Sequence, residues 1–358
     1  MQFTHEDIAP MAVGAAVLGA GGGGDSYLTE GMLTETIRAN GPIEILPVDA
    51  IEANAPVLPL ALVGAPYVGN EMLIGELMLE TVLAHSAEGQ GAPAAVVTIE
   101  MAGLNALIPL IAAGQFGLPI VDADFTGRGV PSLEMTSFRL DGSYPEHQVL
   151  ADPLGRTVQL TGSQDFSVET LLRPLVTVMG SLTAYTMYPL SGHDLRGRSL
   201  DGTLTRCLKV GRVFQSLHGH TADEVDTMLG AIDGIRVATG TVAERLSQSE
   251  LSASQVSITL EDDDYPERLT RIDMKDEFHL VTRDGELLAT VPDLIVVVDS
   301  DTWIPLTVEQ VGLGQRVTVI ALPAHSRWRS DRGVQLTGPG AFGYSTGYVP
   351  FERGEVQA

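Results

Sequence analysis

The sequence is poor in cysteine, lysine and aromatic residues, and it lacks a long unbroken hydrophobic run. Cys207 is the only cysteine, which excludes an internal disulfide and a metal cluster built from thiolates, and indicates a reducing compartment. It falls on the apolar face of a predicted helix and is interpreted as a core residue. No stretch reaches the roughly 18 apolar residues of a membrane span, because Pro56, Pro59 and Pro66 interrupt the best candidate.

Positive charge is scarce as well. The chain has 21 basic residues, of which only Lys209 and Lys275 are lysines, against 46 acidic residues, and its formal net charge is -25. Such a surface repels phosphate backbones and anionic lipids, so we expect no nucleic-acid or membrane partner. The apolar segment 8–20 follows two acidic residues rather than positive charge, unlike a signal peptide, and we expect a cytoplasmic protein.

The length of 358 residues and the hydrophobic content of 44% are typical of two globular domains. Apolar runs alternate with helical patterns over the first half, which predicts parallel strands covered by helices on both faces. The predicted strands are residues 43–47, 57–64, 94–100 and 118–123, and the predicted helices are residues 4–18, 26–39, 70–85 and 104–113. The sequence therefore predicts an α/β fold, with a Rossmann-like parallel-sheet domain over residues 1–165 that carries the site.

The second half has short alternating strands separated by turn signals, which is typical of a β-rich barrel or sandwich. The predicted strands are residues 255–261, 268–274, 278–282, 287–291, 294–298 and 316–321, and the predicted helices are residues 204–217 and 221–230. Asp284 and Gly285 between two of these strands predict a tight hairpin turn. Residues 166–358 are therefore predicted to form a β-rich C-terminal domain with a few helices.

A run of four glycines, Gly21 to Gly24, joins the first two predicted helices and is followed by Asp25. Successive glycines let backbone N–H groups turn inward, so with the N-terminus of the next helix the run suits an anionic or carbonyl oxygen. We therefore predict that Gly22, Gly23, Gly24 and Asp25 bind the substrate. The alternative is two ordinary helix ends, with glycine as a C-cap and Asp25 as an N-cap.

Three of the glycines in this region, Gly19, Gly21 and Gly24, also match the G-x-G-x-x-G fingerprint of dinucleotide-binding sites. That fingerprint lies between a strand and a helix, whereas a predicted helix precedes it here. We therefore expect no nucleotide cofactor.

Polar residues follow the predicted parallel strands, at the edge where ligands bind in open α/β sheets. The residues predicted to bind substrate there are Glu71, Asn105, Arg128 and Glu134. The candidate catalytic groups are the carboxylates of Glu100, Asp122 and Asp124.

Asp122 and Asp124 lie two residues apart, so on a strand their side chains share a face. One carboxylate of such a pair can stay protonated as a general acid while the other acts as base, or the two can hold a divalent metal such as zinc. The candidate metal ligands are Asp122, Asp124 and His193, which lies in a predicted loop. The alternative is that one aspartate caps a loop and the other pairs with Arg128.

Several segments together resemble a bacterial family that is named after S-methyl thiohydantoin desulfurase. The matching segments are GGGGDSY at 21–27, GAP at 64–66 with Glu71, EMAGLNALIP at 100–109, PIVDAD at 119–124, GR at 127–128, GTL at 202–204, PDL at 292–294 and GPGAFGY at 338–344. The resemblance extends over nearly the whole chain. It implies a Rossmann-like N-terminal domain, a C-terminal β domain, and kinship with hydantoinases and oxoprolinases.

The activity that this resemblance implies is hydrolytic removal of the methylthio group from an S-methyl thiohydantoin, which yields a hydantoin and methanethiol. Asp122 or Asp124, or a metal-bound hydroxide that they hold, then serves as the base. The glycine-run amides, Asn105 and Arg128 donate hydrogen bonds to the negative charge that develops on the ring.

The sequence departs from the family pattern at residues 101–102 and 125–126, so we expect the shape of the pocket and the preferred substrate to differ. The substrate is expected to be a small cyclic amide or thioimidate. The alternative function is a non-catalytic subunit or ligand-binding module that accompanies a separate hydantoinase or oxoprolinase. We also expect a homo-oligomer.

Overall fold

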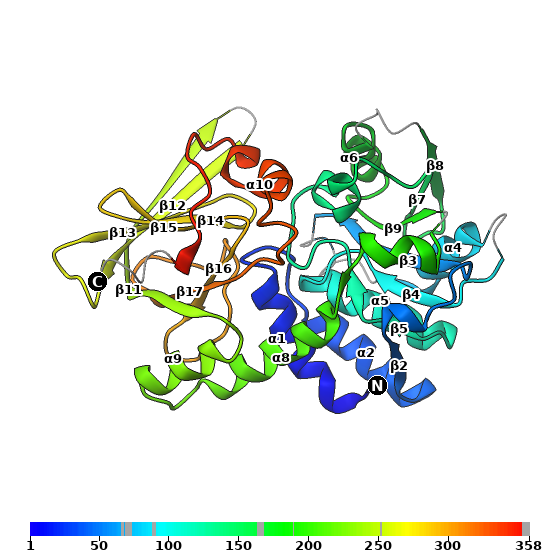
Figure 1. The fold of residues 1–358 in the computed structure, drawn as a ribbon, viewed down its shortest axis with the longest axis horizontal. Coiled ribbons are helices and arrows are strands. Elements are labelled where there is room, and N and C mark those ends of the chain that lie inside the picture. Colours follow the sequence, from blue (N-terminus) through cyan, green and yellow to red (C-terminus); the bar gives the residue numbers. More distant parts are fainter. Residues whose placement is uncertain are drawn as a thin grey trace. The chain divides into compact units, whose positions relative to one another are not determined.

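The chain forms two units in the computed structural model, which describes residues 1–65, 68, 74–87, 91–162, 168–188, 190–250 and 253–352 (Figure 1). The first unit comprises Met1–Ala15 and Gly23–Leu208, and the second comprises Ala16–Gly22 and Lys209–Ala358. The division falls inside the helices α1 (Ile8–Leu18) and α8 (Thr203–Ser216), and it separates Gly22 from Gly23. The domain boundary expected near residue 165 lies outside the described residues.

The first unit is built on an eight-stranded mixed sheet. In spatial order its strands are β1 (Gln2–Phe3), β2 (Ile43–Leu46), β5 (Ile120–Val121), β4 (Ala95–Thr98), β3 (Val57–Gly64), β9 (Leu182–Tyr188), β7 (His147–Ala151) and β8 (Thr157–Thr161). The four strands from β2 to β3 run parallel, and their carboxyl ends meet at one edge of the sheet. The predicted α/β class is confirmed, although the sheet is only partly parallel.

The antiparallel strands β9, β7 and β8 extend the sheet beyond β3 and were not predicted from the sequence. Along β8, partly buried residues alternate with exposed ones, so the strand offers no continuous apolar run to find. β9 joins the sheet through pairs such as Ala61 with Tyr185, which lie far apart in sequence. Pairing of this kind depends on tertiary contacts rather than on local pattern.

Helices pack on both the parallel and the antiparallel strands of the sheet. The helix α5 (Gly103–Phe116) packs on β3 and β4, α2 (Tyr27–Asn40) packs on α5, and α4 (Glu76–Ser86) packs on β7 and β9. A Cβ at Gly114 of α5 would lie 2.5 Å from the Thr36 side chain, so glycine permits the close approach of α5 and α2. The predicted helices 26–39 and 104–113 are confirmed.

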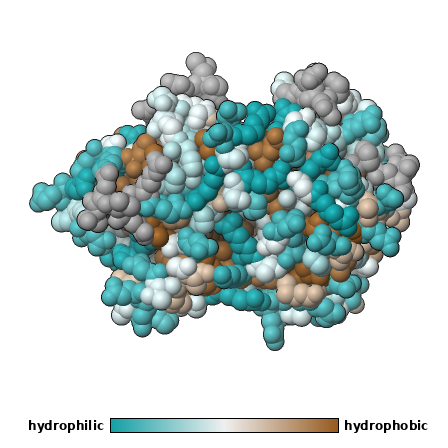
Figure 2. All heavy atoms as spheres, viewed as in Figure 1, coloured by the Kyte–Doolittle hydropathy of each residue, from teal (hydrophilic) through white to brown (hydrophobic). Residues whose placement is uncertain are grey.

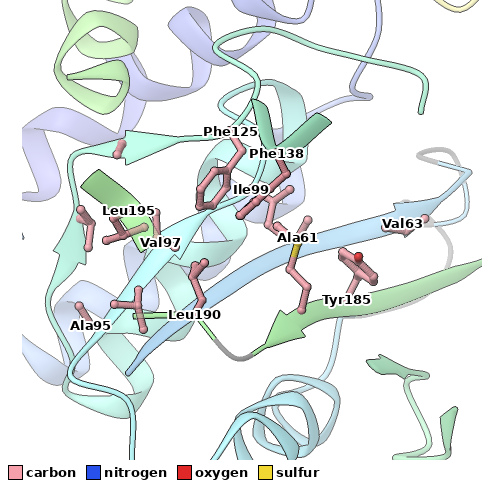
Figure 3. Packing of buried hydrophobic residues seen from close by; sticks show 14 of the residues in the cluster. Ala61, Val63, Ala95, Val97, Ile99, Phe125, Phe138, Tyr185, Leu190 and Leu195 are labelled. Atoms are coloured by element: carbon pink, nitrogen blue, oxygen red, sulfur yellow. The ribbon is translucent and has the colours of Figure 1, made fainter. Parts of the chain in front are cut away.

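One face of the sheet carries a hydrophobic cluster that includes alternate residues of β4 and residues of α6 (Val168–Val178) (Figure 3). Phe125 and Phe138 lie in this cluster with their ring centroids 4.6 Å apart, and Ile99 is close to them. Ala123 and Phe125, on either side of Asp124, both belong to this cluster, so the alternation of side chains turns Asp124 away from it.

The second unit contains a seven-stranded antiparallel sheet. Its spatial order is β15 (Glu286–Thr290), β14 (Phe278–Arg283), β13 (Leu269–Met274), β12 (Ala253–Asp262), β11 (Ile235–Glu250), β17 (Arg316–Leu322) and β16 (Leu294–Asp299). β14 and β16 contact each other although they stand near opposite ends of this order, so the sheet curls into a half-barrel around its own core. The predicted β-rich second half is confirmed.

The predicted hairpin turn is also confirmed, because Asp284 and Gly285 both have positive φ angles, 50° and 84°, between paired strands. The long strand β11 was missed. A Cβ at its Gly240 would lie 2.1 Å from the Glu261 carbonyl oxygen, so this glycine serves the close pairing of β11 with β12.

The remaining short elements complete the two units. They are the helices α7 (Gly192–Arg198), α9 (Ala222–Gly230) and α10 (Asp331–Thr337), the strands β6 (Ala123–Asp124) and β10 (Leu200–Asp201), and the 3-10 turns His5–Asp7, Val48–Ala50, Leu133–Met135, Ser137–Leu140 and Pro339–Phe342. Hydrophilic residues predominate on the face drawn in Figure 2. Within the described ranges no helix has the length and apolarity that a membrane crossing requires.

Candidate functional site

The carboxylates of Glu100 and Asp124 lie at neighbouring strand ends of the first unit. Glu100 follows β4, and Asp124 ends β6, the short strand that continues from β5. Val96 of β4 is paired with Ile120 of β5, and the Phe125 N–H donates to the Ile99 carbonyl oxygen at 3.1 Å. This parallel register places the two segments side by side beyond the sheet, as the sequence predicts for the carboxyl ends of neighbouring strands.

Asp124 is fully buried and organises the loops around it. Its Oδ2 atom accepts hydrogen bonds from the N–H groups of Met101 at 2.8 Å and Gly127 at 2.7 Å, and from the Thr126 hydroxyl at 3.0 Å. Its Oδ1 atom is buried and accepts no hydrogen bond from the described part of the chain. Burial raises the pKa of Asp124 to about 6, and the hydrogen bonds to Oδ2 oppose that rise.

Glu100 is only partly buried, and both of its carboxylate oxygens are held. Oε1 accepts the Val130 N–H at 2.8 Å, and Oε2 accepts the side-chain amide of Asn105 at 2.7 Å. Burial raises the pKa of Glu100 to about 7, the negative charge of Asp124 adds to the rise, and the hydrogen bonds and the Arg128 guanidinium oppose it. Glu100 is therefore a carboxyl group that can gain or lose a proton near neutral pH.

Asn105, in the first turn of α5, links Glu100 to β3. Its Oδ1 accepts the Leu62 N–H at 2.6 Å, and its Nδ2 donates to the Leu62 carbonyl oxygen at 3.0 Å as well as to Glu100. A side-chain amide has two N–H groups, and both are engaged here. Asn105 therefore contacts Glu100, and direct binding of the substrate by Asn105 stays a prediction.

Arg128 and Glu134 were also predicted to bind substrate. Arg128 is 2% exposed and its Nε donates to the Gly129 carbonyl oxygen at 2.9 Å, so its positive charge lies inside the loop that follows Asp124. Glu134 forms an ion pair with Arg139 at 2.8 Å. Glu71, another residue predicted to bind substrate, lies outside the described residues.

Asp122 has different partners from Asp124. Its Oδ1 accepts the Thr205 N–H at 3.0 Å, and its Oδ2 accepts the Thr205 hydroxyl. Thr205 lies in the first turn of α8, where backbone N–H groups lack acceptors within the helix, so Asp122 caps that helix from another part of the chain. The alternative was that one of the two aspartates caps a loop and the other pairs with Arg128, whereas Asp122 caps a helix.

The three candidate metal ligands are not brought together as one donor set. His193 is exposed on α7, whereas Asp122 is engaged by Thr205 and Asp124 by backbone N–H groups. Among the residues that the structure describes, no three His, Cys, Asp or Glu side chains form a group that could hold a metal ion. The described candidates therefore do not fit a metal centre, and the divalent metal stays a prediction of the sequence.

The glycine run meets the start of α5. The Gly23 carbonyl oxygen accepts the Leu104 N–H at 3.0 Å, so a backbone carbonyl caps α5, which has no side-chain cap. A Cβ on Gly103 would lie 2.2 Å from this carbonyl oxygen, so neither glycine tolerates a side chain without a backbone shift. Sequence reasoning missed this contact, although glycines at both positions are a signal of close backbone approach.

The other members of the run are placed differently. The N–H groups of Gly23 and Gly24, which both have positive φ angles, donate to no acceptor among the described residues. Asp25 is exposed, and its Oδ1 accepts the Tyr27 N–H at 2.9 Å, whereas the N-cap position of α2 is Ser26 rather than Asp25. Gly22 belongs to the second unit, where a Cβ added to it would lie 3.0 Å from the Asp276 carbonyl oxygen.

Comparisons with known proteins cover almost the whole chain. A family model described as "S-Me-THD-like, N-terminal domain" matches residues 6–162, and one described as "S-Me-THD-like, C-terminal domain" matches residues 163–351. A crystal structure of a protein from Chromobacterium violaceum is similar to this chain, with a TM-score of 0.78 and 25% sequence identity over 98% of this chain and 99% of that one. A comparison with curated proteins found no match.

Proposed function

From the finding that the chain belongs to the S-Me-THD-like family, we propose that it is a hydrolase acting on a hydantoin-like ring, with Glu100 as the general base. The proposed substrate is an S-methyl thiohydantoin, and the proposed products are a hydantoin and methanethiol. The observation that carries the assignment of the base is the environment of Glu100: a partly buried residue whose carboxylate is held by two donors and whose pKa is raised by burial to about 7.

In the proposed reaction, the Glu100 carboxylate takes a proton from a water molecule as the water oxygen attacks the ring carbon that bears the methylthio group. The adduct then collapses, the carbon–sulfur bond breaks, and protonated Glu100 returns the proton to the departing methanethiolate. The remaining hydroxyl proton moves to the ring nitrogen, which gives the carbonyl and N–H of the hydantoin. One water molecule is consumed, so the atoms balance. A group with a pKa near the working pH is suited to both transfers, because both of its forms are populated.

The negative charge that develops on the ring nitrogen needs nearby donors or positive charge. The N–H groups of Gly23 and Gly24, which have no acceptor in the described part of the chain, support this role. The buried guanidinium of Arg128 already acts electrostatically on Glu100 and contributes positive charge to the same region. Asp124 then serves to hold the loops that present Glu100 and Arg128.

The proposal is tested by incubating the purified full-length protein with S-methyl thiohydantoins, with and without added divalent metal. Thiol release is followed with a chromogenic disulfide, and the hydantoin is identified by mass spectrometry. Release of both products in equal amounts supports the proposal. Absence of thiol release under every condition overturns it, and co-purification with a separate hydantoinase or oxoprolinase then favours a non-catalytic subunit. Metal analysis of the same preparation tests the divalent metal, and size-exclusion chromatography tests the homo-oligomer.

A further inference from the structure

We infer that Asn105 is a positioning residue, which holds the Glu100 carboxylate in place by tying it to the end of β3. This inference rests on the proposed function, in which Glu100 is the base. The residue itself does not touch the reacting atoms, because its donors are used within the protein.

The backbone pairing of β3 with β4 ends near Leu60. The two strands are paired in register from Val57 with Ala95 to Leu60 with Thr98, and the Ile99 N–H still donates to the Leu60 carbonyl oxygen at 3.1 Å. At Leu62, two residues further along β3, the side chain of Asn105 supplies both the acceptor and the donor. The amide of Asn105 therefore takes the place of the next backbone amide of β4 in the ladder.

Because the Asn105 side chain replaces β4 as the hydrogen-bond partner of Leu62, the chain can turn away from β3 at Glu100. The backbone N–H and carbonyl groups of Leu62 remain hydrogen-bonded. Buried backbone groups without hydrogen-bond partners destabilise the folded state, so the pairing at Leu62 fixes the position of the Asn105 amide. Its second N–H then donates to Oε2 of Glu100, and the distance from Nδ2 of Asn105 to this oxygen is 2.7 Å. The position of one carboxylate oxygen is thus set by the backbone of a strand that Glu100 does not belong to.

The hydrogen bond from Asn105 lowers the pKa of Glu100. The hydrogen bond from Asn105 favours the ionised form of Glu100 and lowers its pKa, as do the Val130 N–H and the Arg128 guanidinium, while burial and Asp124 raise it. Loss of the Asn105 donor therefore raises the pKa of Glu100. A carboxyl group in place of the amide raises it further, because a second negative charge then lies beside Oε2.

The test measures the protonation of Glu100 directly and needs no substrate. Protein labelled with 13C at the glutamate carboxyl carbons is titrated by NMR, and the Glu100 signal is assigned by its loss in Glu100→Gln. We expect the midpoint to rise by about one pH unit or more in Asn105→Asp, and by a smaller amount in Asn105→Leu. Asn54→Asp, a change at an exposed position of the same unit, is the control and leaves the midpoint unchanged.

A folded Asn105→Asp protein whose Glu100 midpoint matches the wild-type value overturns the inference, and Asn105→Leu decides the matter if the aspartate variant does not fold. In kinetic assays the positioning role predicts that the acid limb of the kcat/KM profile moves to higher pH, with about tenfold lower kcat/KM well below that limb. If the wild-type protein has no hydrolytic activity, the proposed function is overturned. The role of Asn105 is then decided by the NMR titration alone.

Discussion

The backbones of Gly23 and Gly103 touch, and a Cβ on Gly103 would lie 2.2 Å from the Gly23 carbonyl oxygen. The same carbonyl oxygen accepts the Leu104 N–H at 3.0 Å, so the contact joins the glycine run to the start of α5. Asn105, which holds Glu100, is the next residue of that helix. The glycine run therefore supports the candidate base through the first turn of α5.

This contact predicts the effect of a methyl group at Gly103. We expect Gly103→Ala to destabilise the protein by about 2–4 kcal/mol, because alanine adds a clash with backbone and is strained at the positive φ of 48°. Gly31→Ala is the matched control, since a Cβ there meets nothing within 4 Å and the position lies within α2. The control is expected to gain about 0.5–1 kcal/mol. Urea unfolding of the two variants compares them, and equal stabilities contradict the contact.

The pH dependence of turnover follows from the pKa of Glu100, which is raised to about 7. A general base works only in its ionised form, so kcat/KM is expected to rise with pH up to about 7 and to level off above it. Measurement between pH 5 and 9, in a range where the protein stays folded, gives the midpoint. A profile that is already flat below pH 6 argues against Glu100 as the base.

The carboxylates of Glu100 and Asp122 are expected to respond differently to amide substitution. Glu100→Gln removes the base, and we expect kcat to fall by about 10²–10⁴-fold with the fold retained. Asp122→Asn perturbs the cap of α8, and we expect a loss of about 1 kcal/mol of stability with kcat within a few-fold of the wild type. Turnover assays and thermal unfolding of both variants provide the comparison. A loss of turnover in Asp122→Asn without a loss in Glu100→Gln would reassign the base to Asp122.

The raised pKa of Asp124 predicts that the stability of the protein depends on pH. Its pKa is raised by burial from an ordinary value of 3.8 to about 6, so the folded protein holds this proton more tightly than the unfolded chain. Its contribution to stability is therefore greatest at low pH, falls as the pH rises from about 4 to about 6, and stays constant above that. The size of the fall is on the order of 3 kcal/mol.

The measurement is urea unfolding of the wild type and Asp124→Asn at pH 4.5 and pH 7.5. We expect the variant to lose less stability than the wild type between the two pH values, because asparagine does not titrate. Asp49→Asn, at a side chain that is 95% exposed, serves as the control and should follow the wild type. Identical pH dependence in wild type and Asp124→Asn is the result that contradicts the raised pKa.

Much of the first unit could be predicted because its central strands carry their own signal. The strand β3 matches the predicted residues 57–64, and seven of its eight residues are buried, which produces the unbroken apolar run. The turn at Asp284 and Gly285 was predictable for a similar local reason, since both residues tolerate positive φ angles. Glu100 and Asp124 were found as candidates because they follow such runs.

The tertiary structure decided which role each candidate can take. Asp122 and Asp124 are alike in the sequence, yet the first caps α8 through Thr205 and the second is buried among N–H groups of two loops. The sequence departs from the family pattern at Phe125 and Thr126. Phe125 packs in the core beside Phe138, and the Thr126 hydroxyl donates a hydrogen bond to Asp124. Composition and periodicity determined the fold class and the list of candidates, because strand burial and turn chemistry are local. The pKa and the orientation of the Glu100 carboxylate depend on its burial and on Asn105, Val130 and Asp124. Only folding brings these residues to Glu100.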